Sequence, residues 1–237
     1  MTSHDQTAHN QALHTQTAHG RGPSRRTVLT GGLAIAVALG IRAPRAQAAT
    51  PAETPWAKAR SANGWPLLGS FDTVTVEGSG VTVPLAGGVA TIILTHLARR
   101  FHYEIDALRA GDLSGGTTDR SVQVAEQSNY LSGTALGIRP GSYPVGQRGN
   151  LFPKELVVIQ DMVTECEGVV LWGGDLPVPM EGHFQLDLPP TDARVRSLAE
   201  RFGHIDTFDS PHGAGAVDAS DPARRARART FRRPGER

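Results

Sequence analysis

The sequence predicts an α+β protein with a small, mainly antiparallel sheet flanked by helices. Three observations support this class. Polar and apolar residues alternate through Asp72–Leu85 around a Gly-Ser-Gly break, two long segments carry apolar residues at helical spacing, and two short apolar segments flank the Gly- and Pro-rich loop Gly173–Pro179. Mixed helices and hairpin strands along one chain are typical of α+β folds.

Composition limits the classes of function. The chain has 237 residues, 39% of them hydrophobic, with 27 Gly and 16 Pro, which indicates one loop-rich domain with extensions. A net charge of +1 provides no overall field for nucleic acid or a membrane surface, so we expect neither as a partner. The single cysteine, Cys166, excludes an internal disulfide, and its apolar neighbours predict a buried position.

The N-terminal segment predicts export. The pair Arg25–Arg26 precedes the apolar run Gly31–Ile41, and a small-residue cleavage site follows at Ala46–Ala48. A charged region, a short apolar region and such a site are typical of a signal peptide, and the twin arginine indicates the Tat route. We therefore expect residues 1–48 to be a Tat signal with a disordered lead, and the mature protein to be extracellular or wall-associated with no membrane span. An uncleaved N-terminal anchor is the alternative.

The C-terminal segment, residues 209–237, has almost no apolar residues and seven Arg after Pro222. Such a composition cannot bury enough surface to order itself, so we expect a disordered basic tail, with an anionic wall polymer as a conceivable partner. The folded domain is then predicted over residues 49–208.

Within that domain the elements follow from periodicity and end signals. After the hairpin, the segment 87–105 predicts a helix, because its apolar residues recur at helical spacing. Residues 152–169 predict a second helix with Pro153 in its first turn. Residues 169–175 and 182–189 predict short strands. Residues 192–204 predict an amphipathic helix ending at Gly203.

Three motifs carry a resemblance. "SNYLSGTALGIRPGSYP" (128–144), "VVLWGGD" (169–175) and "MEGHFQLD" (180–187) are similar, in order and spacing, to the core of the zinc D-alanyl-D-alanine carboxypeptidases and dipeptidases. These exported enzymes trim peptidoglycan stem peptides. The resemblance covers most of residues 60–200 and implies that fold, zinc as cofactor and a stem peptide as ligand.

The same resemblance assigns site positions. The family's first block resembles S-N-H-x-S-G-T-A-x-D-I, whose His and Asp zinc ligands correspond to Tyr130 and Gly137 here. The third ligand is His183, and the acidic general base three residues earlier corresponds to Met180. Arg120 matches an upstream Arg that faces the substrate. Two of three ligands and the base are thus replaced, and we expect zinc binding to be weak or absent.

Further positions follow from the same blocks. Ser132, Gly133 and Thr134 are expected to contact the peptide, and Trp172 to form the floor of the cleft. Three functions stay open: a catalytically impaired domain that binds stem peptides, which we favour; an active metallopeptidase using His183, Glu181 and Asp175; and a structural cell-envelope protein attached through its tail. Whether the chain is an enzyme is left undecided by the sequence.

Overall fold

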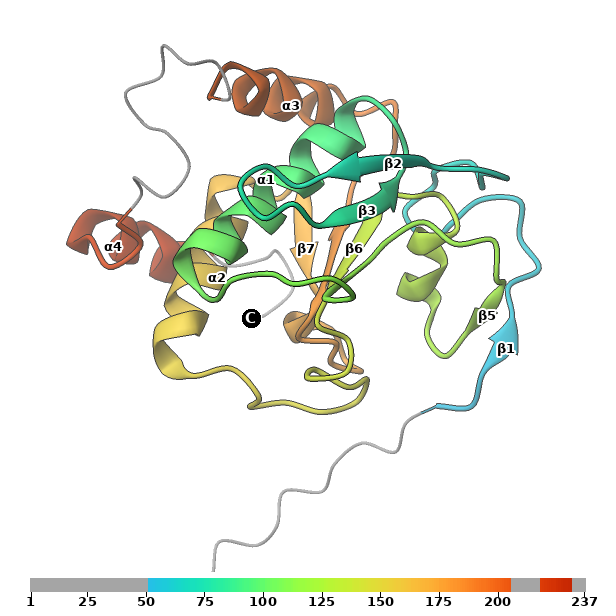
Figure 1. The fold of residues 1–237 in the computed structure, drawn as a ribbon, viewed down its shortest axis with the longest axis horizontal. Helices are drawn as coiled ribbons and strands as arrows, with labels where there is room; N and C mark the ends of the chain where they lie inside the picture. The colour runs from blue at the N-terminus through green and yellow to red at the C-terminus, as the bar shows by residue number, and fades with distance from the viewer. Residues whose placement is uncertain (1–50, 206–217, 232–237) are drawn as a thin grey trace, which may run out of the picture. The chain divides into compact units, whose positions relative to one another are not determined.

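The computed structural model of the chain describes residues 51–205 and 218–231 (Figure 1). The export signal predicted over residues 1–48 therefore lies outside the described residues. The strands are β1 (Thr54–Pro55), β2 (Asp72–Thr75), β3 (Thr82–Leu85), β4 (Leu113–Ser114), β5 (Ser121–Val122), β6 (Ala135–Ile138), β7 (Val170–Trp172) and β8 (His183–Leu186). The helices are α1 (Val89–Glu104), α2 (Pro153–Glu165), α3 (Ala193–Ile205) and α4 (Pro222–Thr230), with short 3-10 helices η1 (Ala125–Tyr130) and η2 (Gly173–Asp175).

The largest sheet has four strands in the order β4-β6-β8-β7, and each neighbouring pair is antiparallel. The predicted hairpin is confirmed as β2–β3, with Asp72 opposite Leu85. A third pairing joins β1 to β5. Helices flank these small antiparallel sheets, so the α+β class is confirmed. Among the described residues, no helix is long and apolar enough to cross a membrane.

The predicted helices are also confirmed. α1 begins at Val89, and its apolar stripe is fully buried: Ala90, Ile93, Leu94, Leu97 and Phe101. α2 begins at Pro153, where the missing N–H of proline costs nothing because the first helical N–H groups have no intrahelical partner. α3 continues two residues past the predicted end, to Ile205. Cys166, at the end of α2, is buried as predicted.

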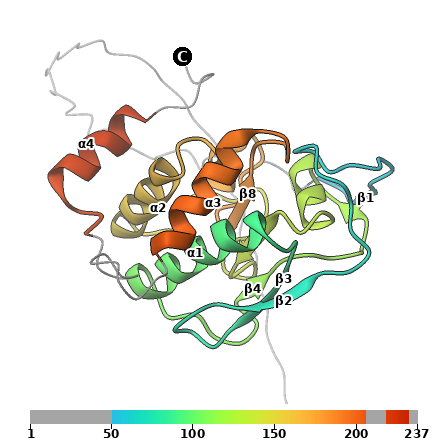
Figure 2. The ribbon, with the colours of Figure 1, turned by 90° about the horizontal axis from the view of Figure 1, so that it is seen from above.

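The four-stranded sheet has two different faces because side chains alternate along each strand. Phe184 and Leu186 of β8, together with Trp172 of β7, pack into the apolar core that α1, α2 and α3 complete. In Figure 2 these three helices lie side by side. His183 and Gln185 of β8 point to the other face. We call this second face the polar face, and it carries the candidate site.

A buried ion cluster connects the helices. Arg100 of α1 is 1% exposed and donates to Glu104, to Asp161 and to Glu165, at 2.6 to 2.8 Å. Burial disfavours the charged form of Arg100. Its hydrogen bond to Glu104 and the negative charge of Glu104 outweigh this effect and raise the pKa of Arg100. Burial would raise the pKa of Glu165, yet His96 and Arg100 lower it to about 2. Arg100 and Glu165 therefore stay ionised in the fold.

The expectation of a disordered C-terminal tail is wrong for residues 218–231, which form α4 against α2. Arg224 donates to both oxygens of Asp161, from Nε at 2.9 Å and from Nη2 at 2.6 Å. The Asp221 carboxylate caps the helix by accepting from the N–H groups of Ala223 and Arg224. The composition argument considered apolar burial alone, whereas a buried carboxylate and a cap stabilise this segment.

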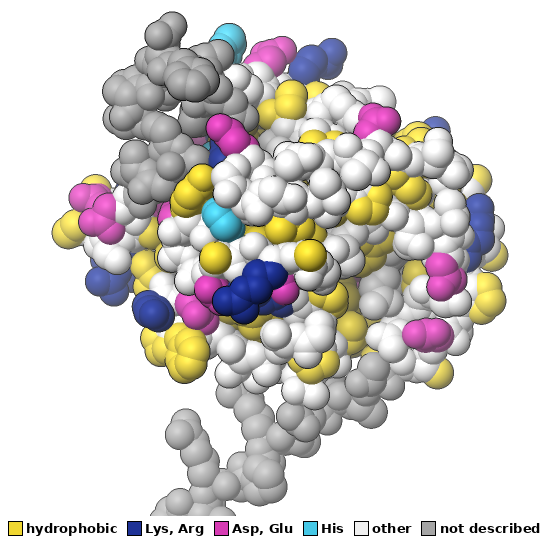
Figure 3. Space-filling model, in the orientation of Figure 1, with side chains coloured by type: hydrophobic (Ala, Val, Ile, Leu, Met, Phe, Trp, Pro, Cys, Tyr) yellow, Lys and Arg dark blue, Asp and Glu magenta, His cyan; other side chains and the backbone are white. Residues whose placement is uncertain are grey.

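Elsewhere the charged side chains are mixed. The face of the molecule in Figure 3 carries basic and acidic side chains among one another rather than in one patch of a single sign. This distribution agrees with the net charge of +1 and provides no strong local field on that face.

We predict that Arg100→Leu lowers the free energy of unfolding by about 3–5 kcal/mol, because it leaves buried carboxylates without their shared cation. Urea unfolding measures this change. The control is Arg194→Ala, which breaks an exposed pair with Asp192 and should cause no measurable loss. Equal effects of the two variants would contradict a stabilising role for the cluster.

Candidate functional site

The three positions matched to zinc ligands meet on the polar face of the sheet. Gly137 of β6 lies directly opposite His183 of β8 in the antiparallel register. η1 ends at Tyr130 and brings its hydroxyl to 2.8 Å from Nδ1 of His183. The structure therefore brings together Tyr130 and His183, which are 53 positions apart in sequence, as the family resemblance implies.

Both nitrogens of His183 are hydrogen-bonded. Nε2 lies 2.8 Å from Oε1 of Gln185, and the same oxygen accepts from Nδ2 of Asn129 at 2.8 Å. Because Oε1 is only an acceptor, Nε2 carries the proton and Nδ1 must accept. The Tyr130 hydroxyl therefore donates to Nδ1, and Ser114 donates to the Tyr130 oxygen. The result is one chain, Ser114–Tyr130–His183–Gln185–Asn129, which we call the hydroxyl–imidazole chain.

Burial keeps this chain uncharged at neutral pH. Burial lowers the pKa of His183 to about 4, an effect that the bond to Gln185 only partly offsets. Burial raises the pKa of Tyr130 well above its ordinary value of 10.0, against a smaller opposing effect of the Ser114 bond. The imidazole is therefore neutral and the phenol protonated, so neither group presents a charge to a ligand.

Gly137 lies where an added side chain would crowd Ser114 first and the Tyr130 hydroxyl second. A Cβ at position 137 would lie 2.2 Å from Oγ of Ser114 and 2.8 Å from Oη of Tyr130. Real Cβ atoms do not approach other atoms so closely, so a side chain at 137 needs a shift of its neighbours. The large residue at 130 and the missing side chain at 137 thus depend on each other.

A small cavity of about 150 Å³ opens beside this chain. Its lining is mainly apolar and uncharged, with no carboxylate among the described residues that form it: Ser114, Gln127, Tyr130, Gly137, Pro140, Tyr143, Val145, Met180, Gly182 and His183. Met180, at the position matched to the general base, is 4% exposed and packs with Leu171 and Leu176. We call this cavity the Tyr130 pocket.

The residues of the Tyr130 pocket do not fit a zinc ion. Zinc needs about three strong ligands, and a neutral His must offer it a free nitrogen lone pair. Here the Nδ1 lone pair of His183 is used by Tyr130, and the raised pKa of Tyr130 keeps its oxygen protonated. Within residues 51–205 and 218–231, no group of three or more His, Cys, Asp or Glu is placed to hold a metal.

Glu181, the expected alternative base, is not among the residues that line the Tyr130 pocket. Its carboxylate accepts from the backbone N–H of Gly149 at 2.7 Å and of Asn150 at 2.9 Å, and from Nδ2 of Asn150 at 2.9 Å. The expectation that Glu181 acts beside His183 stays a prediction, and the contacts that the structure gives this carboxylate are those with residues 149–150. The carboxylate holds the loop around residues 149–150 against the start of β8.

Two other expected residues lie elsewhere. Arg120 is exposed and donates to the backbone oxygens of Trp56 and Lys58, so it fixes the segment near β1 and does not line the Tyr130 pocket. Trp172 packs on the helix-covered face, and Asp175 borders a second pocket with it. Trp172 is therefore no floor for the Tyr130 pocket, because the sheet separates them.

The Ser-Gly-Thr run has a structural role. Oγ of Ser132 and Oγ1 of Thr134 share a hydrogen bond of 2.8 Å. Oγ1 of Thr134 also accepts from Nδ2 of Asn63 at 2.8 Å. Gly133 has a φ of +64°, and a Cβ there would lie 2.4 Å from the backbone N of Ala86. These residues are buried and join β6 to the N-terminal segment, which gives them a packing role; their expected peptide contacts stay a prediction.

Sequence reasoning missed three members of the site: Ser114, Asn129 and Gln185. A signal for Gln185 was available, because it is two residues from His183 in a strand and so shares its face. Asn129 precedes Tyr130 in the first motif but was given no role. Ser114 lies far from every motif and reaches the site only through the pairing of β4 with β6.

Comparison of the chain with protein-family models, with curated proteins and with solved structures finds no match. The three sequence motifs are what carries the family resemblance.

We predict that the free energy of unfolding falls as the pH drops from about 6.5 to about 4. In this window the unfolded chain protonates His183 while the folded chain does not, so protons favour unfolding. The pKa difference corresponds to roughly 3 kcal/mol. Chemical unfolding across the window measures the loss, and His183→Gln should show a smaller one. An equal loss in both proteins would contradict the buried neutral imidazole.

We also predict that Gly137→Ala destabilises the fold by about 1–3 kcal/mol, because its Cβ overlaps Oγ of Ser114 and Oη of Tyr130. Adding Ser114→Ala removes the nearest of these atoms. The double variant should then be more stable than the sum of the single effects, as thermal unfolding can show. Gly141→Ala is the matched control, since its Cβ would have no neighbour within 4 Å. Additive effects would contradict the steric argument.

Proposed function

We propose that the chain is an exported cell-envelope domain of the zinc D-alanyl-D-alanine carboxypeptidase type that binds peptidoglycan stem peptides without cleaving them. The observation that carries the proposal is the meeting of Tyr130, Gly137 and His183 in one pocket. The family resemblance implies such a meeting, and the residue types found here do not supply the metal chemistry.

Binding without cleavage follows from what lines the pocket. Peptide hydrolysis needs an activated water and a group that takes its proton. The described lining has no carboxylate, and both nitrogens of His183 are held in the hydroxyl–imidazole chain. The pocket still offers the hydroxyl oxygens of Ser114 and Tyr130 as acceptors, the amide of Gln127 and an apolar wall at Met180. Such a lining suits the small methyl side chains of a D-Ala-D-Ala end rather than its terminal carboxylate.

Export belongs to the same proposal. The twin-arginine signal would take the chain across the cytoplasmic membrane as a folded protein, to the compartment that holds stem peptides. A fold with one cysteine needs no oxidation step after export.

The proposal predicts that the mature protein binds a stem pentapeptide ending in D-Ala-D-Ala and releases no D-alanine. Calorimetric titration measures affinity, and chromatography of the mixture measures release. Tyr130→Phe should weaken binding several-fold, because it removes a hydroxyl that borders the pocket. Tyr103→Phe is the matched control, since Tyr103 is 51% exposed and outside the pocket, and should leave binding unchanged.

Three outcomes would overturn the proposal. Stoichiometric zinc together with release of D-alanine would show an active metallopeptidase. If the folded protein does not bind the pentapeptide, the proposed ligand is wrong and a structural role is favoured. If the Tyr130→Phe and wild-type proteins bind it equally, the Tyr130 pocket is not the binding site.

A further inference from the structure

The helix α4 carries four arginines and no acidic residue, and the structure places these arginines on two different faces. Arg224 and Arg227 are three positions apart, so they share one face of the helix. Arg224 binds Asp161 of α2, and Nη2 of Arg227 lies 3.1 Å from Oε1 of Glu167, in the turn after α2. This face, which we call the docking face, uses its positive charges inside the protein.

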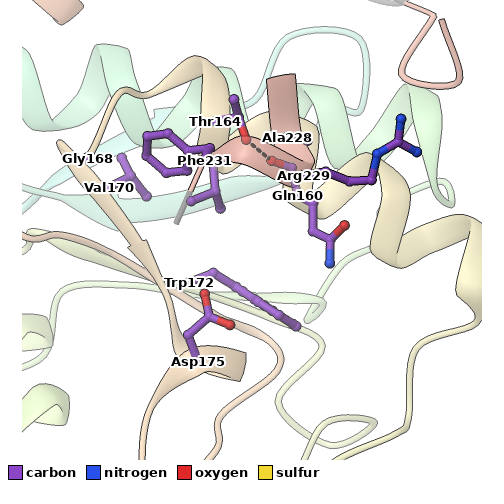
Figure 4. Close-up of a pocket in the computed structure, with 10 residues that line it drawn as sticks. Gln160, Thr164, Gly168, Val170, Trp172, Asp175, Ala228, Arg229 and Phe231 are labelled. Atoms are coloured by element: carbon purple, nitrogen blue, oxygen red, sulfur yellow. Dashed lines mark hydrogen bonds between the residues drawn. The ribbon is translucent and has the colours of Figure 1, made fainter. Parts of the chain in front are cut away.

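The other two arginines of α4 form a second face, which we call the outward face. Arg225 and Arg229 are four positions apart and so are neighbours on the helix surface, and Arg225 lies about 100° around the axis from Arg224. Both residues are exposed, and in Figure 4 the guanidinium of Arg229 points away from Trp172. Within residues 51–205 and 218–231, neither guanidinium has a hydrogen bond or an ion pair.

The carboxylates that α4 contacts lie at its N-terminal end or on its docking face. Asp221 accepts from the first N–H groups of the helix, and Asp161 and Glu167 bind the arginines of the docking face. The outward face therefore presents two neighbouring positive charges that no carboxylate of the described residues pairs with. Such a face attracts a ligand of opposite charge.

Docking fixes the direction in which the outward arginines point. Two hydrogen bonds tie Arg224 to Asp161, which is only 3% exposed. If the helix rolled or detached, this buried carboxylate would lose one of its two guanidinium partners, which costs free energy. Side chains that are held on a docked helix lose less freedom when a ligand binds than side chains on an unattached tail.

The side chains of α4 restrict the class of anion. A guanidinium is planar and matches the oxygens of a phosphate with two parallel N–H groups. The helix has no aromatic or amide side chain, so it offers nothing on which a nucleic-acid base could stack or be read. It also has no large apolar side chain that could enter a lipid surface. These features favour a phosphate polymer that carries no bases.

We propose that the outward face of α4 binds a flexible, base-free polyanion whose repeating charge is a phosphodiester, of the polyol phosphate class. Neighbouring phosphates contact Arg225 and Arg229, while Arg224 holds the helix on the protein. This function goes beyond stem-peptide binding and does not depend on it, since neither Arg225 nor Arg229 lines the Tyr130 pocket.

The salt dependence of binding tests the proposal. Fluorescence anisotropy of a labelled glycerol phosphate oligomer measures its affinity for the mature protein at several salt concentrations. Each phosphate contact contributes about −0.7 to the slope of log affinity against log salt, so Arg225→Ala combined with Arg229→Ala should make the slope shallower by about 1.4. The matched control combines Arg109→Ala with Arg196→Ala, which removes two exposed arginines from other parts of the chain and should leave the slope unchanged.

Two other polymers of equal charge test the ligand class. Oligothymidylate should bind no more tightly than the glycerol phosphate oligomer, because α4 does not read bases, and polyglutamate should bind more weakly than both. Tighter binding of oligothymidylate would indicate a nucleic-acid site and overturn the proposed ligand. Polyglutamate binding as tightly as glycerol phosphate would overturn the preference for phosphate.

A further variant tests the part that docking plays. Arg224→Ala should weaken glycerol phosphate binding about threefold without a change of slope, because the outward arginines are then less firmly held. Unchanged affinity of this variant would overturn the role of docking. No binding of the oligomer, or equal changes of slope in the two double variants, would overturn the outward face as the site. Pentapeptide affinity should be the same with and without Arg225 and Arg229, which separates this site from the Tyr130 pocket.

Discussion

The hydrogen bond from the Tyr130 hydroxyl to Nδ1 of His183 is the interaction on which the polar face depends. His183 is 2% exposed, and a buried imidazole without a partner on either nitrogen costs free energy. Gln185 satisfies one nitrogen and Tyr130 the other, so the ring is neutral and fully bonded. In a zinc peptidase the metal would take one of these nitrogens. Here a phenol does so, and the site stabilises the fold.

Among the helices, buried polar groups must likewise be paired, and here the paired groups are ionised side chains. Arg100 is shared among three carboxylates, and Asp161 also receives Arg224 from α4. If Asp161 shared only the Arg100 guanidinium, its buried negative charge would be incompletely neutralised. Arg224 supplies the second guanidinium, which explains why a segment of low hydrophobicity folds onto α2. The polar face is thus satisfied by neutral hydrogen bonds, and the helix layer by ion pairs that reach into the C-terminal segment.

Local patterns predicted much of the fold, and long-range pairing decided the rest. Helical spacing and Pro153 located α1 and α2, and alternation located the β2–β3 hairpin. The family resemblance, and not periodicity, implied that Tyr130, Gly137 and His183 meet. The order of the strands, the contact from Ser114 and the turn of Glu181 toward residues 149–150 depend on partners distant in sequence, which periodicity does not encode. α4 was missed because its stabilising partner, Asp161, lies in another helix.

The replaced positions also restrain one another. An Asp side chain at 137 has no room while Tyr130 and Ser114 keep their places, so a ligand cannot return there alone. Replacing Tyr130 first would leave His183 with a buried nitrogen that lacks a partner. A carboxylate at 180 would enter an apolar group formed with Leu171 and Leu176 and would lose hydration there. Each single substitution toward the residue of that family therefore costs stability without building a metal site, and only a concerted change at all three positions would introduce ligands and space together.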